Sequence, residues 1–266
     1  MTESLHTDGD RTVLRMERRF RHPRAQVWQA LTEPDRLVQW FPARAEFEPV
    51  AGADVTFDWG EGDGPVVDGR VVDAEPGRVL AFTWSGEVLR FVLHDDGDGC
   101  RLEFTHEFDD RYGAASFASG WVQCFAGLDQ LLSGVPIYAG SPSAAQHDAF
   151  VARFGLDAGT VTTGPDGWRV RFERQLTAPA EVAWPVIERL AAAPADDVLE
   201  RAEAKALEYS APGGGRVRWE LGQGTGHGAR LVVTESAPAP GGDLDADAVA
   251  AGWRERVDAL ARELRG

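Results

Sequence analysis

Cysteine, long apolar runs and basic side chains are all scarce in this chain of 266 residues. The two cysteines, Cys100 and Cys124, are too few for a disulfide framework and suit a reducing compartment. The sequence has no apolar run of about 18 residues, the minimum for a membrane-spanning helix. Its N-terminus, MTESLHTDGDRT, has neither the basic nor the apolar region of a secretion signal. We therefore expect a cytoplasmic protein without a membrane span.

The charge balance narrows the range of partners. Lysine and arginine number 27 against 43 aspartate and glutamate residues, and the net charge is −16. A surface this acidic repels nucleic-acid backbones and anionic membranes, so we expect neither as a partner. The cysteines and the six histidines show no zinc-ligand spacing. The acidic turn DDGDG at residues 95–99 does not continue as a calcium loop requires, so we expect no metal and no cofactor.

The chain contains an internal repeat. VLRMERRFRHPRAQVWQAL at residues 13–31 resembles RVRFERQLTAPAEVAWPVI at residues 169–187, and Arg, Glu, Arg, Pro and Trp recur in register. CRLEFTHEF at residues 100–108 resembles ARLVVTESA at residues 229–237, and each block is followed by a Gly-Trp pair that opens an apolar helical run. Two matching blocks in the same order predict two related domains. Nothing in the second half matches residues 46–70, so we expect the second domain to lack two strands.

These matches lead to a division of the chain into four parts. We expect a disordered N-terminus over residues 1–11, a complete domain over residues 12–156, a linker over residues 157–167 and a shortened domain over residues 168–266. An incomplete sheet leaves an unpaired edge that needs covering. We therefore expect the two domains to pack on each other, and the sequence also allows a homodimer.

The pattern of apolar residues predicts an α+β fold in each half. Residues 12–20 alternate with a period of two, which is typical of a strand, and two short helical segments follow over residues 23–41. Strand-like runs separated by Gly or Pro turns over residues 46–108 predict an antiparallel meander. Residues 114–134 predict a long helix with a broad apolar face. Because that face must be covered, we expect the sheet to wrap around the helix while the short helices close one end.

Three motifs resemble those of the family related to the activator of Hsp90 ATPase, in the START-like or SRPBCC superfamily. They are F-x-H-P-x-x-x-V-W-x-A-L-T-E-P-D-x-L-x-x-W-F-P at residues 20–42, CRLEFTHEF at residues 100–108, and GWVQCFAGLDQLL at residues 120–132. The resemblance implies a helix-grip fold, present twice with the second copy shortened. It also implies a cavity between the sheet and the long helix that holds an apolar or aromatic molecule. Members of this superfamily include carriers, receptors and enzymes, so the fold alone does not choose a function.

Aromatic side chains on inward phases of the first domain, with one histidine, are the candidate ligand contacts. They are Trp40, Phe41, Phe57, Trp59, Phe82, Trp84, Phe91, Phe104, His106, Trp121 and Phe125. Such side chains suit a flat or apolar ligand, whereas the usual role of any single aromatic side chain is to pack in the core.

Three inward-directed polar residues have two interpretations each. His106 lies in phase with Phe104 and Phe108 and is the one candidate for catalysis, as a base or as a group that orients a ligand hydroxyl. The interpretation that we favour is a buried histidine satisfied by the backbone. Arg18 and its repeat Arg174 either pair with a ligand carboxylate or form ion pairs with acidic side chains of the protein. Their repetition in the shortened half favours the ion pairs.

We expect a non-enzymatic protein that binds a small hydrophobic or aromatic ligand. One alternative is a cavity enzyme of the polyketide aromatase/cyclase or hydrolase type, in which His106 acts on the substrate. The other is a chaperone-interacting protein, which the resemblance to Hsp90 activators implies. We rank the chaperone role last, because nothing in the chain matches the N-terminal domain of the eukaryotic activator.

Overall fold

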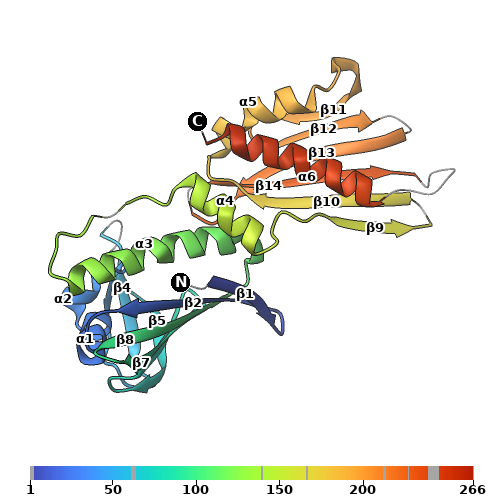
Figure 1. Ribbon diagram of the computed structural model, residues 1–266. Coiled ribbons are helices and arrows are strands. Elements are labelled where there is room, and N and C mark those ends of the chain that lie inside the picture. The colour runs from blue at the N-terminus through green and yellow to red at the C-terminus, as the bar shows by residue number, and fades with distance from the viewer. Residues whose placement is uncertain are drawn as a thin grey trace. The chain divides into compact units, whose positions relative to one another are not determined.

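The computed structural model describes residues 3–60, 64–138, 140–165, 167–211, 214–226, 228–238 and 246–265. Its contacts divide the chain into two units. The first unit comprises Met1–Ala114 and Ala118–Pro142, and the second comprises Ala115–Phe117 and Ser143–Gly266. In each unit an antiparallel sheet is covered on one face by a long helix (Figure 1). The fold is therefore α+β and of the helix-grip type, present twice.

The sheet of the first unit is an antiparallel meander whose last strand, β8, pairs with β2. In spatial order the strands are β1 (Glu3–Asp8), β2 (Arg11–Phe20), β8 (Gly99–Phe108), β7 (Glu87–Asp96), β6 (Val79–Trp84), β5 (Val66–Glu75), β4 (Asp54–Asp58) and β3 (Arg44–Glu46). The helices are α1 (Arg24–Thr32), α2 (Pro34–Leu37) and α3 (Ala114–Leu132), with a 3₁₀ turn at Arg111–Gly113 before α3.

Alternating burial shows why these residues form a sheet with one covered face. Along β8, every second side chain from Cys100 to Phe108 is fully buried, and the side chains between them are half-buried. This period of two arises because one face of the sheet packs on α3 and the other faces water. The indole nitrogen of Trp40 donates a hydrogen bond of 2.9 Å to the carbonyl of Ala30. That bond fastens the residues after α2 to α1, whereas Trp28 on α1 is only half-buried.

The second unit repeats this topology with a shorter sheet. Its strands lie in the order β9 (Thr160–Gly164), β10 (Gly167–Gln175), β14 (Ala229–Ala237), β13 (Gly215–Gln223), β12 (Ala206–Ala211) and β11 (Val198–Ala202). Its helices are α4 (Ala144–Arg153), α5 (Ala180–Ala191) and α6 (Ala246–Glu263), with a 3₁₀ turn at Ala195–Asp197. The order matches the first sheet from β1 to β5, and among the described residues β3 and β4 have no counterpart. The predicted loss of two strands is confirmed.

The same close backbone approach recurs in both units. A Cβ atom added to Gly99 would lie 2.3 Å from the carbonyl oxygen of Phe20, and one added to Gly228 would lie 1.8 Å from that of Leu176. Both distances are far below van der Waals contact, so only glycine fits where the last strand of each sheet begins. Phe20 and Leu176 are matched in the sequence repeat, which supports the duplication at atomic detail.

Three expectations about the domain boundaries are wrong. Residues 3–8 are not disordered, because each residue of β1 pairs with a residue of β2; residues 1 and 2 lie outside the described part. Residues 160–164 of the expected linker form β9, which pairs with β10. Helix α4 belongs by its contacts to the second unit and not to the first. Its Asp148 carboxylate lies 2.7 Å from the guanidinium of Arg174 and 2.6 Å from that of Arg265.

No helix in the described part of the chain is long and apolar enough to cross a membrane.

Candidate functional site

The first unit contains a connected cluster of aromatic rings between its sheet and α3. Every candidate side chain from the sequence belongs to it: Trp40, Phe41, Phe57, Trp59, Phe82, Trp84, Phe91, Phe104, His106, Trp121 and Phe125. The closest ring centroids are those of Phe104 and Trp121, at 4.5 Å. We call this set the aromatic cluster. Its rings touch one another, so most of them form the core of the unit.

Two further rings join the cluster. Phe47 contacts Phe82 at 5.4 Å between ring centroids, and Phe108 contacts His106 at 4.9 Å. Phe108 lies on the same face of β8 as Phe104 and His106, because side chains alternate between the two faces of a strand. This alternation indicates that Phe108 points inward. Phe47 directly follows the short strand β3, where the alternation of side chains ends and gives no guide.

Exposure changes from one end of the aromatic cluster to the other. Phe91 and Phe104 are at most 1% exposed, whereas Trp84 is half-buried and Trp59 is 47% exposed. The rings of Trp59 and Trp84 lie 5.3 Å apart between centroids with an interplanar angle of 30°. The cluster therefore reaches solvent at the pair of Trp59 and Trp84.

A chain of hydrogen bonds runs beside the aromatic cluster. Trp121 Nε1 donates to His106 Nδ1 at 3.1 Å, and His106 Nε2 lies 2.6 Å from Glu87 Oε2. Because an indole N–H only donates, Nδ1 is the acceptor, and Nε2 carries the hydrogen that Glu87 accepts. Glu87 pairs with Trp84 in the β6–β7 hairpin, and its side chain is 27% exposed. The chain of bonds thus ends at a partly exposed carboxylate next to the open end of the cluster.

This geometry assigns an orienting role to His106. Both ring nitrogens are engaged, one with Trp121 and one with Glu87, so the imidazole is not available as a base in this arrangement. The ring nitrogens of the histidine bond to side chains, whereas the sequence analysis favoured backbone partners. The group that a ligand can reach is the carboxylate of Glu87, which sequence reasoning did not single out.

Residues 21–133 match the family model described as "Activator of Hsp90 ATPase homolog 1-like protein". Apart from residues 115–117, the matched residues lie in the first unit, which is therefore similar to this family. No curated protein matches the chain.

Three solved structures that are similar to part of the chain have the following identities, TM-scores and coverages. A conserved protein of unknown function, EF2215 from Enterococcus faecalis, is 18% identical with a TM-score of 0.47, over 56% of this chain and 88% of its own. CalU16 from Micromonospora echinospora, solved by NMR, is 20% identical with a TM-score of 0.45, over 57% and 93%. Protein MLL2253 from Mesorhizobium loti is 28% identical with a TM-score of 0.41, over 47% and 98%.

The buried arginine of the first unit forms an ion pair, as its recurrence predicted. Arg18 Nη1 lies 3.0 Å from Glu3 Oε1, and its guanidinium carbon lies 5.7 Å from the ring centroid of Phe125. Burial lowers the pKa of Arg18, and the charge of Glu3 opposes that effect. In the second unit Arg174 pairs with Asp148 at 2.7 Å, with a further acidic partner on α6. Both arginines therefore stabilise the protein's own structure.

Burial changes the acidity of the two cysteines. Burial raises the pKa of Cys100 to about 11 and that of Cys124 to about 12. Both are therefore thiols and not thiolates near neutral pH. Within the described ranges, no group of three or more His, Cys, Asp or Glu side chains is arranged to hold a metal ion.

Proposed function

We propose that the first unit binds a small aromatic or apolar molecule at the open end of the aromatic cluster. One observation carries the proposal: a partly exposed tryptophan pair adjoins a carboxylate that a buried histidine orients. Trp59 and Trp84 supply the apolar surface, and Glu87 supplies the polar group. Small-molecule sites typically combine a largely apolar lining with a few placed polar groups.

The contacts at this end of the cluster favour a ligand of a particular chemistry. Trp84 lies 5.8 Å from Phe41 and 5.9 Å from Phe57 between ring centroids, so a flat ring stacked on it continues an existing aromatic array. His106 engages Oε2 of Glu87, and the other oxygen, Oε1, faces no partner that would compete with a ligand donor among the described residues. We infer a ligand with an aromatic body and one hydroxyl or amine that donates to Glu87.

The geometry removes His106 as the base of the alternative enzyme function. A general base must have a nitrogen or oxygen within hydrogen-bond reach of the proton that it removes. His106 uses both nitrogens within the protein. The imidazole therefore positions the Glu87 carboxylate for recognition.

Titration of the full chain with 2-naphthol and with its methyl ether tests the proposal. Both compounds should raise the midpoint of thermal unfolding, since a ligand that binds the native state stabilises it. Isothermal titration should show tighter binding of 2-naphthol, because only it can donate to Glu87. Glu87→Gln should reduce this preference and leave the affinity for the ether unchanged. Trp59→Ala should weaken both ligands, and Tyr138→Ala, which removes a ring that is 78% exposed, is the matched control.

Two results would overturn the proposal. One is that neither compound binds to the full chain. The other is that Trp59→Ala binds both compounds as the wild type does. Because Trp59 is half in solvent, its removal leaves the buried core of the domain intact, and loss of folding does not confound the measurement.

A further inference from the structure

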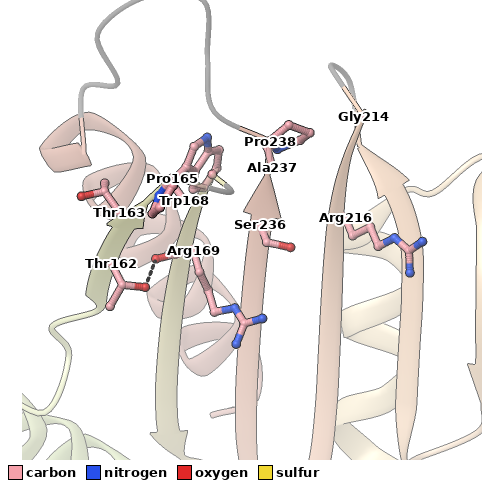
Figure 2. Close-up of a pocket in the computed structure, with 12 residues that line it drawn as sticks. Thr162, Thr163, Pro165, Trp168, Arg169, Gly214, Arg216, Ser236, Ala237 and Pro238 are labelled. Atoms are coloured by element: carbon pink, nitrogen blue, oxygen red, sulfur yellow. Dashed lines mark hydrogen bonds between the residues drawn. The ribbon is translucent and has the colours of Figure 1, made fainter.

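A polar cavity lies on the outer face of the second sheet. It has a volume of about 450 Å³, and its lining includes Thr162, Arg169, Arg216 and Ser236 (Figure 2). These side chains alternate along their strands with buried ones such as Val170, which belong to the core beneath α5 and α6. The cavity is therefore on the face of the sheet opposite to its helices and is separate from the aromatic cluster of the first unit.

The polar side chains of this cavity stand in one row across the sheet. Strand pairing places Thr162 opposite Arg169, Arg169 opposite Ser236, Ser236 opposite Arg216, and Arg216 opposite Ser210. Neighbouring strands are about 4.8 Å apart, so the two arginines are separated by about 9.6 Å with the serine between them. Hydroxyls and guanidiniums thus alternate in a row that contains no carboxylate.

The charges of this row are poorly neutralised. Within the described part of the chain, Arg169 forms no ion pair, and Arg216 reaches Glu208 only at 3.4 Å with its side chain 67% exposed. Glu208 is already held at 2.8 Å by Arg218 of the next row. Arg218 also contacts Glu200 at 2.5 Å. Carboxylates of the described residues therefore leave Arg169 unpaired and engage Arg216 only at its exposed end.

We propose that Arg169, Ser236 and Arg216 bind the phosphate group of a small molecule. A guanidinium presents parallel N–H donors that match phosphate oxygens, and two of them flanking one hydroxyl suit a doubly charged group. Arg169 lies along the sheet face between β10 and β14, whereas Arg216 leans toward β12 (Figure 2). Binding requires Arg216 to turn from Glu208, which costs little because that side chain is exposed and Glu208 keeps Arg218.

The rest of the ligand meets an apolar end of the same cavity. Pro165 and Pro238 line it where the strands end (Figure 2). A ring attached to the phosphate would face these side chains. The inferred ligand class is a phosphate monoester with an apolar body, and it does not depend on the ligand of the first unit.

Titration calorimetry of the full chain with phenyl phosphate tests this site. We expect saturable binding that Arg169→Gln and Arg216→Gln each weaken about fivefold or more, since each removes a charged fork. Arg70→Gln removes the same charge from an exposed arginine of the first unit and should change the affinity less than about twofold. Ser236→Ala should weaken binding by about two- to fivefold, because one hydroxyl donor is lost.

Three outcomes would overturn the assignment. Absence of saturable binding would remove the site. Equal weakening by Arg169→Gln and Arg70→Gln would show only a response to net charge. Benzoate binding as tightly as phenyl phosphate would show that the site does not select phosphate. All the substituted side chains lie on the solvent face of their strands, so the variants retain the core beneath α6.

Discussion

Replacement of Glu3 by glutamine measures how firmly β1 is held to the first unit. Glu3 Oε1 lies 3.0 Å from Arg18 Nη1, and the two side chains are only 5% and 7% exposed. Arg18 also donates to the backbone carbonyl of Glu17 at 2.8 Å. Glu3 is therefore the carboxylate that neutralises a guanidinium inside the protein.

The expected loss of stability is large. Removal of one partner of a buried ion pair costs about 3–5 kcal/mol, because the other charge stays buried without compensation. Glutamine keeps an oxygen that can accept one hydrogen bond, so we place Glu3→Gln near the lower end, at about 3 kcal/mol. That is a substantial share of the roughly 5–15 kcal/mol by which a domain is stable.

Urea unfolding of the full chain supplies the measurement. Amide exchange of peptides from β2 and β8 assigns the transition to the first unit, since tryptophan fluorescence reports on both units. Glu46→Gln is the control, because it removes an equal charge from a solvent-exposed pair with Arg44 at 2.8 Å and should leave stability nearly unchanged. Equal losses in Glu3→Gln and Glu46→Gln would refute the reasoning. Adding Arg18→Met to Glu3→Gln should recover stability, since an apolar side chain needs no counter-ion.

Three further predictions concern buried polar groups. Trp121→Phe should lower the thermal stability of the first unit by about 1–2 kcal/mol, because Nδ1 of His106 loses its donor; an unchanged midpoint would contradict this. At pH 8, pKa values of about 11 and about 12 should leave Cys100 and Cys124 unreactive toward a disulfide reagent until urea unfolds the protein, and rapid native-state labelling would disprove it. Burial alone would raise the pKa of Asp148, but the imidazole of His147, 3.8 Å away, and the charges of Arg174 and Arg265 lower it. Its stabilising effect should therefore be complete above the ordinary aspartate pKa of 3.8 and be lost as the pH falls through the lowered value. In urea unfolding at a series of pH values, Asp148→Asn should lose less stability on acidification than the wild type does. Equal losses of stability in the wild type and in Asp148→Asn would contradict this prediction.

Local alternation was sufficient to predict most of the sheet. The strand-like runs expected over residues 46–108 end with β8, and the expected helix over residues 114–134 corresponds to α3. A period of two or of 3.6 is visible in a short window, because it arises from one buried face. The absence of a match for residues 46–70 was also enough to predict which strands the second sheet lacks.

Strands held by pairing alone were beyond such prediction. In β1 only Glu3 and Leu5 are partly shielded, and the remaining side chains are exposed. The strand exists because its backbone pairs along the whole of Glu3–Asp8 with β2 and because Glu3 meets Arg18. Neither cause leaves an apolar pattern in the sequence, and the same holds for β9.

The candidate site also has a part that the sequence could predict and a part that it could not. The alternation of side chains along the strands correctly predicted which rings point to the interior, and all of them lie in one cluster. Alternation does not show how deeply a ring is buried, and Trp59 is 47% exposed. The partners of His106 could not be named from the sequence. Glu87 comes from the neighbouring strand and Trp121 from the helix across the core, so their meeting depends on the sheet register and on the rotation of α3.

Comparison of the two units distinguishes the contacts that fasten the fold from the group that we propose to contact a ligand. In each unit the tryptophan of the Gly-Trp pair on the long helix donates its indole N–H to the sheet: Trp121 donates to His106, and Trp253 donates to Glu235. His106 and Glu235 occupy matching positions in the repeated blocks of β8 and β14. The donor recurs while the acceptor differs, which indicates that this bond secures the helix on the sheet.

Glu87 has no such repeat. His106 pairs with Leu89 across the sheet and Glu235 pairs with Val217, so the residue matching Glu87 at the start of β13 is Gly215, which has no side chain. A group required only to secure the helix would be expected in both units. The carboxylate beside the exposed tryptophans belongs to the first unit alone, and this difference is the physical reason for placing the ligand there.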